Sequence, residues 1–359
     1  MSDHLHNLLA DDVVLDSLPE DVEASIQVRD DWFAQAGRSE GGFEFLLSDL
    51  TRWAPGQTLR VAFLGGDEQL HRDIAEATKA IAGACNIKLD FGGQAGTFDS
   101  WSEQDTVMAA EIRVSFDQKG YFSLVGTDSV NALIGSPTGR VGGRPYQRSL
   151  NLGGFTIQKP AGWEGTVRHE LLHALSFHHS HQNMRGPCES DFRWEDDPGY
   201  LPTQDAQGRF IADSGGRRPG VYTYLAGFPN FWPKPKVDHN LRLENPQHTV
   251  AGPFDRASVM LYRFPQLFYT TPNSQCAPAG NGVELSVGDK RGLTLLYPHT
   301  EPQRRELAEK RGALLSRLEA DAEADAGAAG GLEGLEKPVQ AHASHSREAI
   351  AILKHLPTT

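Results

Sequence analysis

The sequence of 359 residues has few of the features that mark a specialised class of protein. Its three cysteines, Cys85, Cys188 and Cys276, are too few for a disulfide-rich scaffold. No stretch approaches the ~18 consecutive apolar residues of a membrane span. The first residues lack a basic segment followed by an apolar one, so we expect no secretory signal peptide. The net charge of −13 argues against a nucleic-acid backbone as the partner.

The acidity is unevenly distributed along the chain. Residues 1–50 contain 12 acids and two arginines, whereas residues 51–300 contain 24 bases and 25 acids. We therefore expect an acidic helical leader over 1–50, solvated or loosely docked, followed by a nearly neutral body over 51–300. Residues 301–359 are predicted to form a charged helix, a Gly/Ala-rich linker at 324–334 and a short terminal helix at 346–356.

Apolar periodicity predicts an α/β arrangement at the start of the body. Alternating apolar residues predict strands, and residues at helical spacing predict helices over 67–84, 163–177 and 286–296. The predicted strands cover residues 58–64, 86–91, 110–116, 120–125 and 148–152. Residues 186–253 are rich in Pro, Gly, Asp and Trp, so this segment is expected to be mostly irregular, with a helical piece at 221–226.

His169, Glu170 and His173 form an HExxH sequence within the second predicted helix. Residues four apart lie on one helix face, so both histidines can bind one metal ion. Glu170 follows the first ligand and can act as general base on a metal-bound water. Neutral imidazoles suit Zn²⁺, which in catalytic sites has three protein ligands and an open position for water. The motif therefore predicts Zn²⁺ as the cofactor.

The continuation of this motif contains candidates for the third ligand. In the longer pattern HExxHxxGxxH, the last histidine corresponds to His179, which is the favoured candidate. The glycine position of that pattern is occupied by Ser176, and a non-glycine residue adopts positive φ only at some steric cost. If the turn is displaced, His178 or His181 becomes the third ligand.

A second element lies far downstream, where Met260 and Tyr262 belong to the sequence SVMLY. The long zinc motif and this S-x-M-x-Y sequence together resemble the metzincins, and among them the bacterial and fungal astacin-like metallopeptidases. The resemblance covers roughly residues 50–300. It implies that Met260 forms the turn beneath the zinc site, the Met-turn. It also implies two roles for Tyr262. This residue would bind zinc in a way that depends on pH and substrate, and it would stabilise the oxyanion.

The resemblance also implies the fold and the activity. The expected fold is an α+β zincin, with a twisted, mostly parallel sheet, an antiparallel edge strand and two main helices, followed by an irregular C-terminal subdomain. The upper subdomain would cover 51–179 and the lower one 180–300. The expected activity is that of a zinc metalloendopeptidase with Glu170 as general base. An extended polypeptide substrate would pair with an edge strand, for which 120–125 is the best candidate.

Two other functions stay open at this point. In a different zincin, a carboxylate of Glu189 or Glu195 would be the third ligand, although the histidine at the expected offset argues against it. Alternatively, the domain is a zinc-stabilised binding module without catalysis, against which the presence of Glu170 argues.

Several further questions stay open from the sequence. Cys188 and Cys276 could pair if the protein is exported, while Cys85 is expected to be a buried apolar group. The family resemblance suggests secretion, whereas the missing signal peptide favours a cytoplasmic protein. The sequence leaves open whether the leader imposes latency, and it predicts no oligomeric state.

Overall fold

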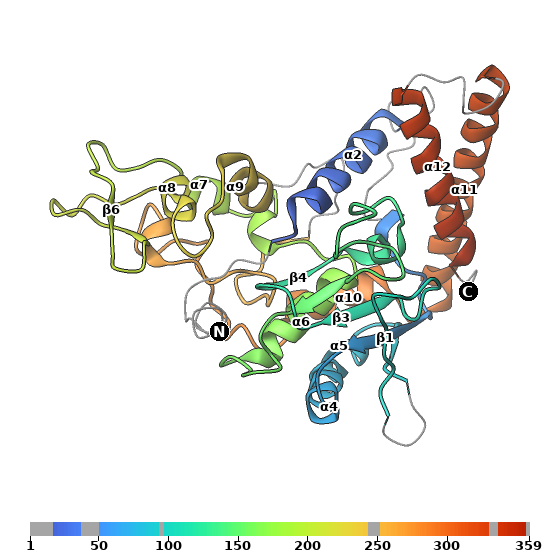
Figure 1. The fold of residues 1–359 in the computed structure, drawn as a ribbon, viewed down its shortest axis with the longest axis horizontal. Helices are drawn as coiled ribbons and strands as arrows, with labels where there is room; N and C mark the ends of the chain where they lie inside the picture. The colour runs from blue at the N-terminus through green and yellow to red at the C-terminus, as the bar shows by residue number, and fades with distance from the viewer. Residues whose placement is uncertain (1–16, 37–49, 93–96, 243–251, 330–336, 357–359) are drawn as a thin grey trace.

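A five-stranded sheet forms the centre of the protein, seen in a computed structural model that describes residues 17–36, 50–92, 97–242, 252–329 and 337–356 (Figure 1). The strand order is β2-β1-β3-β5-β4. The strands are β1 (Thr58–Leu64), β2 (Lys88–Asp90), β3 (Ile112–Ser115), β4 (Tyr121–Ser123) and β5 (Leu150–Leu152). Only the β4–β5 pair of this sheet is antiparallel. The predicted fold class, a mostly parallel sheet with an antiparallel edge strand, is confirmed.

β1 shows why the sheet forms where it does. Leu59, Val61 and Phe63 alternate along the strand and belong to the main hydrophobic core. Ala62 points to the opposite face, where it packs with Trp101. Because successive side chains of a strand point to opposite faces, this alternation buries both faces of β1.

The first helical segment, predicted as one helix over 67–84, consists of two helices, α4 (Glu68–Ala77) and α5 (Lys79–Ala82). Asp67 caps α4 by accepting a hydrogen bond from the Leu70 backbone N–H at 2.8 Å. The interruption lies at Thr78, whose hydroxyl donates to the Ala75 carbonyl at 2.7 Å. Such a bond from a side chain to a nearby backbone carbonyl competes with regular helical geometry, which apolar periodicity does not reveal.

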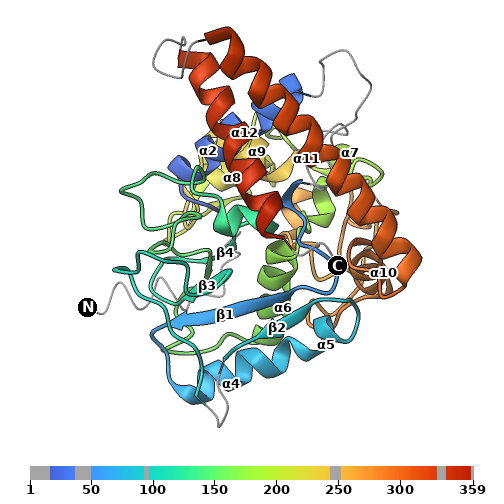
Figure 2. The same ribbon diagram turned by 90° about the vertical axis from the view of Figure 1, so that its right-hand side faces the viewer.

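The second predicted helix is α6 (Trp163–Ala174), which packs with α4 on the face of the sheet that carries the main core. Figure 2 shows both helices beside β1. α6 ends three residues before its predicted end because Ser176 has a φ of 69°. This early end determines where the rest of the histidine motif lies.

The segment predicted to be mostly irregular contains α7 (Cys188–Asp191), the hairpin β6–β7 (Thr203–Gln204 and Phe210–Ile211), α8 (Val221–Ala226) and α9 (Lys234–Leu241). α8 has the predicted bounds. α9 was not predicted, although Pro235 lies in its first turn, where the missing N–H of proline costs nothing. A disulfide joins Cys188 to Cys276 inside a second hydrophobic cluster, whereas Cys85 is a free, buried thiol. The last helix of the body is α10 (Val287–Leu296).

The leader contains the helix α2 (Glu20–Ala36), but the expectation that it is solvated or loosely docked is wrong. Val22, Ile26 and Trp32 are buried against the body. Together with the buried Arg29, these positions follow one another at steps of three or four residues and form a buried stripe on one side of the helix. The many acids on the other faces of this helix obscured the stripe in the sequence.

The tail forms two helices that run side by side, α11 (Glu301–Ala329) and α12 (Lys337–His355) (Figures 1 and 2). Leu314 and Leu318 of α11 contribute to the main core. The predicted linker at 324–334 is wrong for residues 324–329, which continue α11 because alanine is the strongest helix former. Residues 330–336 lie outside the described ranges. α12 begins nine residues before the predicted terminal helix.

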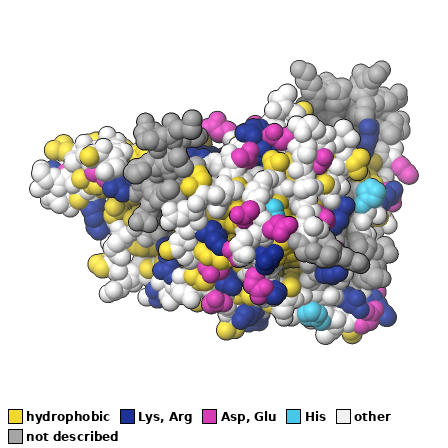
Figure 3. Space-filling model, turned by 60° about the horizontal axis from the view of Figure 1, so that its bottom comes forward, with side chains coloured by type: hydrophobic (Ala, Val, Ile, Leu, Met, Phe, Trp, Pro, Cys, Tyr) yellow, Lys and Arg dark blue, Asp and Glu magenta, His cyan; other side chains and the backbone are white. Residues whose placement is uncertain are grey.

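No helix in the described part of the chain is long and apolar enough to cross a bilayer. On the face shown in Figure 3, basic and acidic side chains are interspersed. The net negative charge of the sequence therefore does not form one continuous acidic patch on this face.

Candidate metal centre

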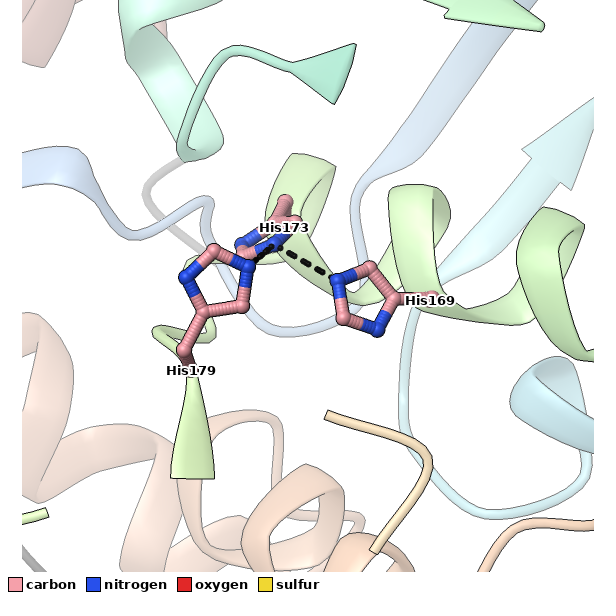
Figure 4. Close-up of side chains that lie close together, drawn as sticks. All are labelled: His169, His173 and His179. Atoms are coloured by element: carbon pink, nitrogen blue, oxygen red, sulfur yellow. Dashed lines mark hydrogen bonds between the residues drawn. The ribbon is translucent and has the colours of Figure 1, made fainter. Parts of the chain in front are cut away.

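The three predicted histidine ligands come together at the C-terminal end of α6 (Figure 4). Nε2 of His173 lies 3.2 Å from Nε2 of His169 and 3.0 Å from Nε2 of His179. A tetrahedral Zn²⁺ with Zn–N bonds of about 2.0–2.1 Å holds its ligand nitrogens about 3.3 Å apart. The observed spacing therefore fits a zinc ion bound by three imidazoles.

The other ring nitrogens of these histidines fix the direction of each ring. Nδ1 of His169 lies 2.7 Å from the Val259 carbonyl, and Nδ1 of His173 lies 2.7 Å from the Phe177 carbonyl. A carbonyl oxygen only accepts hydrogen bonds, so each Nδ1 carries the proton and each Nε2 keeps its lone pair. Carbonyls in this position commonly orient histidines that bind a metal. Both rings are thus held in the tautomer that a metal requires.

His179 lies on a different element from the first two ligands. It precedes the 3₁₀ turn η2 (Ser180–Gln182), and its Nδ1 lies 3.3 Å from Oε1 of Gln182. The chain reaches this position through the positive φ of Ser176. The Ser176 hydroxyl donates to the Thr51 carbonyl at 2.8 Å, which helps to offset the steric cost of the turn. Serine can therefore replace the glycine of the longer pattern here.

Two aromatic side chains hold the end of α6 against the rest of the body. The Trp53 indole N–H donates to the Ala174 carbonyl at 2.8 Å. The Tyr297 hydroxyl donates to the Leu175 carbonyl at 3.2 Å. These carbonyls belong to the last turn, where no intrahelical donor is available. Sequence reasoning gave neither residue a part in the site.

The alternative ligands are not part of this grouping, although the ring of His181 stacks on that of His179 with a centroid distance of 4.9 Å. Nε2 of His181 contacts the Asn240 carbonyl at 2.9 Å. His178 lies close enough to Asp128 for the two groups to interact electrostatically. Glu189 forms an ion pair with Arg242, and Glu195 pairs with Lys234 at 3.7 Å. In the described residues, the only grouping with metal-ligand geometry contains His169, His173 and His179.

Glu170 is almost fully buried beside the first ligand, with 1% of its surface exposed. The helix α6 packs against the edge strand β4, where burial and the negative charge of Glu170 both raise the pKa of Tyr121. The strand itself was predicted, but nothing in the sequence pointed to Tyr121 as a neighbour of the site.

Met260 and Tyr262 also lie next to the histidines. Met260 is 1% exposed, and its carbonyl accepts a hydrogen bond from the Ser180 backbone N–H at 2.9 Å. The ring of Tyr262 stacks on His169 with a centroid distance of 5.6 Å and lies 4.4 Å from the ring of His179. The chain around Met260 is therefore in direct contact with the segment that carries the third ligand.

Asp289 of α10 supports this segment and was missed in the sequence. Its carboxylate accepts hydrogen bonds from the Ser258 hydroxyl at 2.5 Å and from the Val259 N–H at 3.0 Å. It also forms a capping box with Ser286. The S-x-x-D spacing before an apolar run is a recognisable helix-start signal, but it does not reveal that the same carboxylate reaches the metal centre. Through the Val259 carbonyl, Asp289 helps to position His169.

The mixed sheet, α6 and the histidine triad together define a metzincin-like α+β fold with a three-histidine metal site. No model of a known protein family matches the sequence, and no curated protein matches it. Among solved structures, 18 chains match.

These matches include two structures of myroilysin and one of a hatching enzyme. A structure of myroilysin is 25% identical with a TM-score of 0.48, and the match covers 70% of this chain and 97% of that one. A crystal structure of myroilysin is 22% identical with a TM-score of 0.40, covering 69% and 86%. High choriolytic enzyme 1, a hatching-enzyme zinc protease from the medaka Oryzias latipes, is 16% identical with a TM-score of 0.38, covering 69% and 94%.

Proposed function

We propose that the protein is a zinc-dependent endopeptidase. The observation that carries this proposal is the grouping of three imidazoles, in which Nε2 of His173 lies 3.2 Å from that of His169 and 3.0 Å from that of His179, while Nδ1 of His169 and of His173 contact carbonyls. His169, His173 and His179 would hold the zinc ion. A structural zinc site usually has four protein ligands, whereas three leave a position for water.

Glu170 is the proposed general base. When bound, zinc lowers the pKa of its water and polarises the scissile carbonyl. The Glu170 carboxylate takes the proton from the attacking water and delivers it to the nitrogen of the leaving amine. Its burial beside His169 keeps bulk water away from this proton transfer.

Tyr262 is the proposed stabiliser of the oxyanion. Its ring lies against those of His169 and His179, which places the side chain beside the histidine cluster. A positioned hydroxyl donor of this kind typically contributes about 3 kcal/mol to transition-state stabilisation. Met260 is proposed as the apolar residue beneath the site, the Met-turn, where it supports the histidines by packing.

The proposed substrate is a polypeptide in extended conformation. β4 is at the edge of the sheet and, among the described strands, pairs only with β5. An extended chain can add to such an edge through backbone hydrogen bonds. Because Tyr121 of this strand lies near Glu170, a peptide bound there would pass the proposed base.

The decisive experiment combines metal analysis with a protease assay. Purified protein should contain about one zinc ion per chain and should hydrolyse denatured casein, and a chelator should abolish hydrolysis until zinc is restored. Protein that binds zinc but cleaves no unfolded substrate would instead support the non-catalytic binding module. Protein that binds no zinc would contradict the proposal at its first step.

A further inference from the structure

The leader helix α2 makes a buried ion pair with the body. The guanidinium of Arg29 donates to the carboxylate of Asp128, and these side chains are only 5% and 2% exposed. Burial raises the pKa of the Asp128 carboxyl, while the charge of Arg29 opposes this effect. Because charges are costly to bury without a partner, Asp128 depends on Arg29, which also pairs with Asp30 of its own helix at 2.9 Å. A segment that merely covers a surface does not need such a pair.

Asp128 lies in a 3₁₀ turn, η1 (Gly126–Val130), that rests on the turn leading to the third ligand. A Cβ atom on Gly126 would lie 1.8 Å from the Thr51 carbonyl oxygen and 2.3 Å from Oγ of Ser176. The backbone of η1 is therefore in direct contact with Ser176, whose positive φ directs the chain toward His179. Arg29 thus fixes an element against which this turn is packed.

The same helix reaches His179 from the other side through α9. Oε1 of Glu23 accepts a hydrogen bond from Nδ2 of Asn240 at 3.3 Å. The neighbouring carbonyl, that of His239, accepts a hydrogen bond from Nε2 of Gln182 at 2.9 Å. Oε1 of Gln182 in turn lies 3.3 Å from Nδ1 of His179. Figure 1 shows α2 beside α9, in the position that these contacts require.

We propose that α2 braces the metal centre and that Arg29 and Glu23 are positioning residues for His179. His169 and His173 are held by one helix, so their spacing does not depend on α2. His179 follows a turn and is held by contacts with η1 and α9, both of which α2 contacts. This inference rests on the proposed zinc site, and it predicts that leader substitutions alter zinc affinity rather than only stability.

The test uses substitutions in the full-length chain, with zinc affinity measured by competition with a chromophoric chelator. Replacing the partner that orients a metal-binding histidine typically costs 10–100-fold in affinity. Because Arg29 acts through η1, Arg29→Met should weaken zinc binding by about tenfold, at the lower end of that range. Glu23→Met, which removes the acceptor for Asn240, should weaken it less. Zinc binding should be measured at a temperature where circular dichroism shows each variant to be folded.

Two control variants on the same helix separate positioning from general stability. Asp31 is exposed and accepts a hydrogen bond from Gln27 of its own helix at 2.9 Å, so Asp31→Asn should leave zinc affinity unchanged. Val22 is fully buried in the cluster with Phe122 and Leu124. Val22→Ala should lower the melting temperature without changing zinc affinity. If it weakens zinc binding as much as Arg29→Met does, α2 acts through packing and the proposal is wrong.

Each outcome bears on a distinct claim. Folded Arg29→Met and Glu23→Met variants with wild-type zinc affinity overturn the brace, even if the enzyme is an active protease. If Arg29→Met does not fold, Glu23→Met, which removes a less buried acceptor at similar side-chain length, decides the matter alone. Wild-type protein that binds zinc but hydrolyses nothing contradicts the proposed function and leaves the brace intact. Wild-type protein without zinc affinity overturns both.

Discussion

The metal centre is built from two regions that are held in different ways. His169 and His173 lie on one face of α6. The Val259 carbonyl orients the ring of His169, and the Phe177 carbonyl orients that of His173. His179 lies beyond the helix, where Ser176, Thr51 and other residues far apart in the sequence hold the chain. The spacing of the first two ligands therefore depends on local helical geometry, although the distant Val259 carbonyl orients His169, whereas the position of the third ligand depends on tertiary contacts. Substitutions distant from the site should affect the third ligand most.

The largest effect on activity is expected from a substitution in α6, the helix that carries the first two ligands. Glu170→Gln keeps the shape of the side chain but removes its basicity, so hydrolysis should fall by about 10²–10⁴-fold while zinc stays bound. Activity on denatured casein and zinc content by mass spectrometry give the two readouts. A zinc-loaded variant that still cleaved casein at the wild-type rate would refute the role assigned to Glu170.

His179→Ala tests the ligand held by tertiary contacts. Loss of one of three ligands should weaken zinc binding by about 100-fold or more, beyond the effect of losing an orienting partner. His178→Ala is the matched control, because His178 lies outside the group of converging nitrogens. Unchanged zinc stoichiometry in His179→Ala, together with a loss in His178→Ala, would reverse the assignment of the third ligand.

Substitutions at Ser176 probe the turn that separates the two regions. Ser176→Ala keeps the strained positive φ but removes the hydrogen bond to the Thr51 carbonyl, so it should cost about 1–3 kcal/mol in the free energy of unfolding. Ser176→Gly also removes that bond but relieves the strain, and it should cost less. Urea denaturation measures both values. If glycine proves more destabilising than alanine, the φ of 69° is not a source of strain.

Trp53→Phe removes one hydrogen bond from the end of α6. The Ala174 carbonyl would lose its indole donor, with an expected cost of about 1 kcal/mol in the free energy of unfolding. Zinc affinity should change little, because His169 and His173 remain on the same intact helix. A strong loss of zinc affinity in this variant would mean that the helical ligands also depend on distant contacts.

The smallest effect is expected at Asp117, which lies away from the histidines. Although its burial opposes ionisation, the hydrogen-bonded Arg148 guanidinium lowers the pKa of Asp117 to about 2. A lowered pKa stabilises the folded protein above the unfolded value of about 3.9, and this contribution is lost as pH falls toward 2. Because Asp117 is partly exposed, Asp117→Asn should cost less than about 1 kcal/mol near pH 7. Unfolding curves at pH 7 and pH 2 should show the difference from wild type at pH 7 only.

Elements with a strong local pattern were predicted closely. β1 and α8 have the predicted bounds, because alternation in one case and helical spacing in the other coincide with burial. The break at Thr78 was not predicted because a side-chain hydrogen bond cannot be seen in apolar periodicity. The helix α9 was not predicted because its short, polar sequence has little such periodicity. The docking of α2 was underestimated because its few anchors are spread among many acids.

By itself, the sequence determined the helix that presents two histidines and a glutamate, because a spacing of four residues places side chains on one helix face. The mostly parallel sheet was expected from the family resemblance, and the order of its strands was not predicted. The tertiary structure alone decided that His179 rather than His178 or His181 completes the triad, and that Cys188 meets Cys276. It also decided that Asp289, Trp53 and Arg29 lie around the site. The physical reason is that local spacing fixes neighbours within one element, whereas contacts between elements depend on how the whole chain packs.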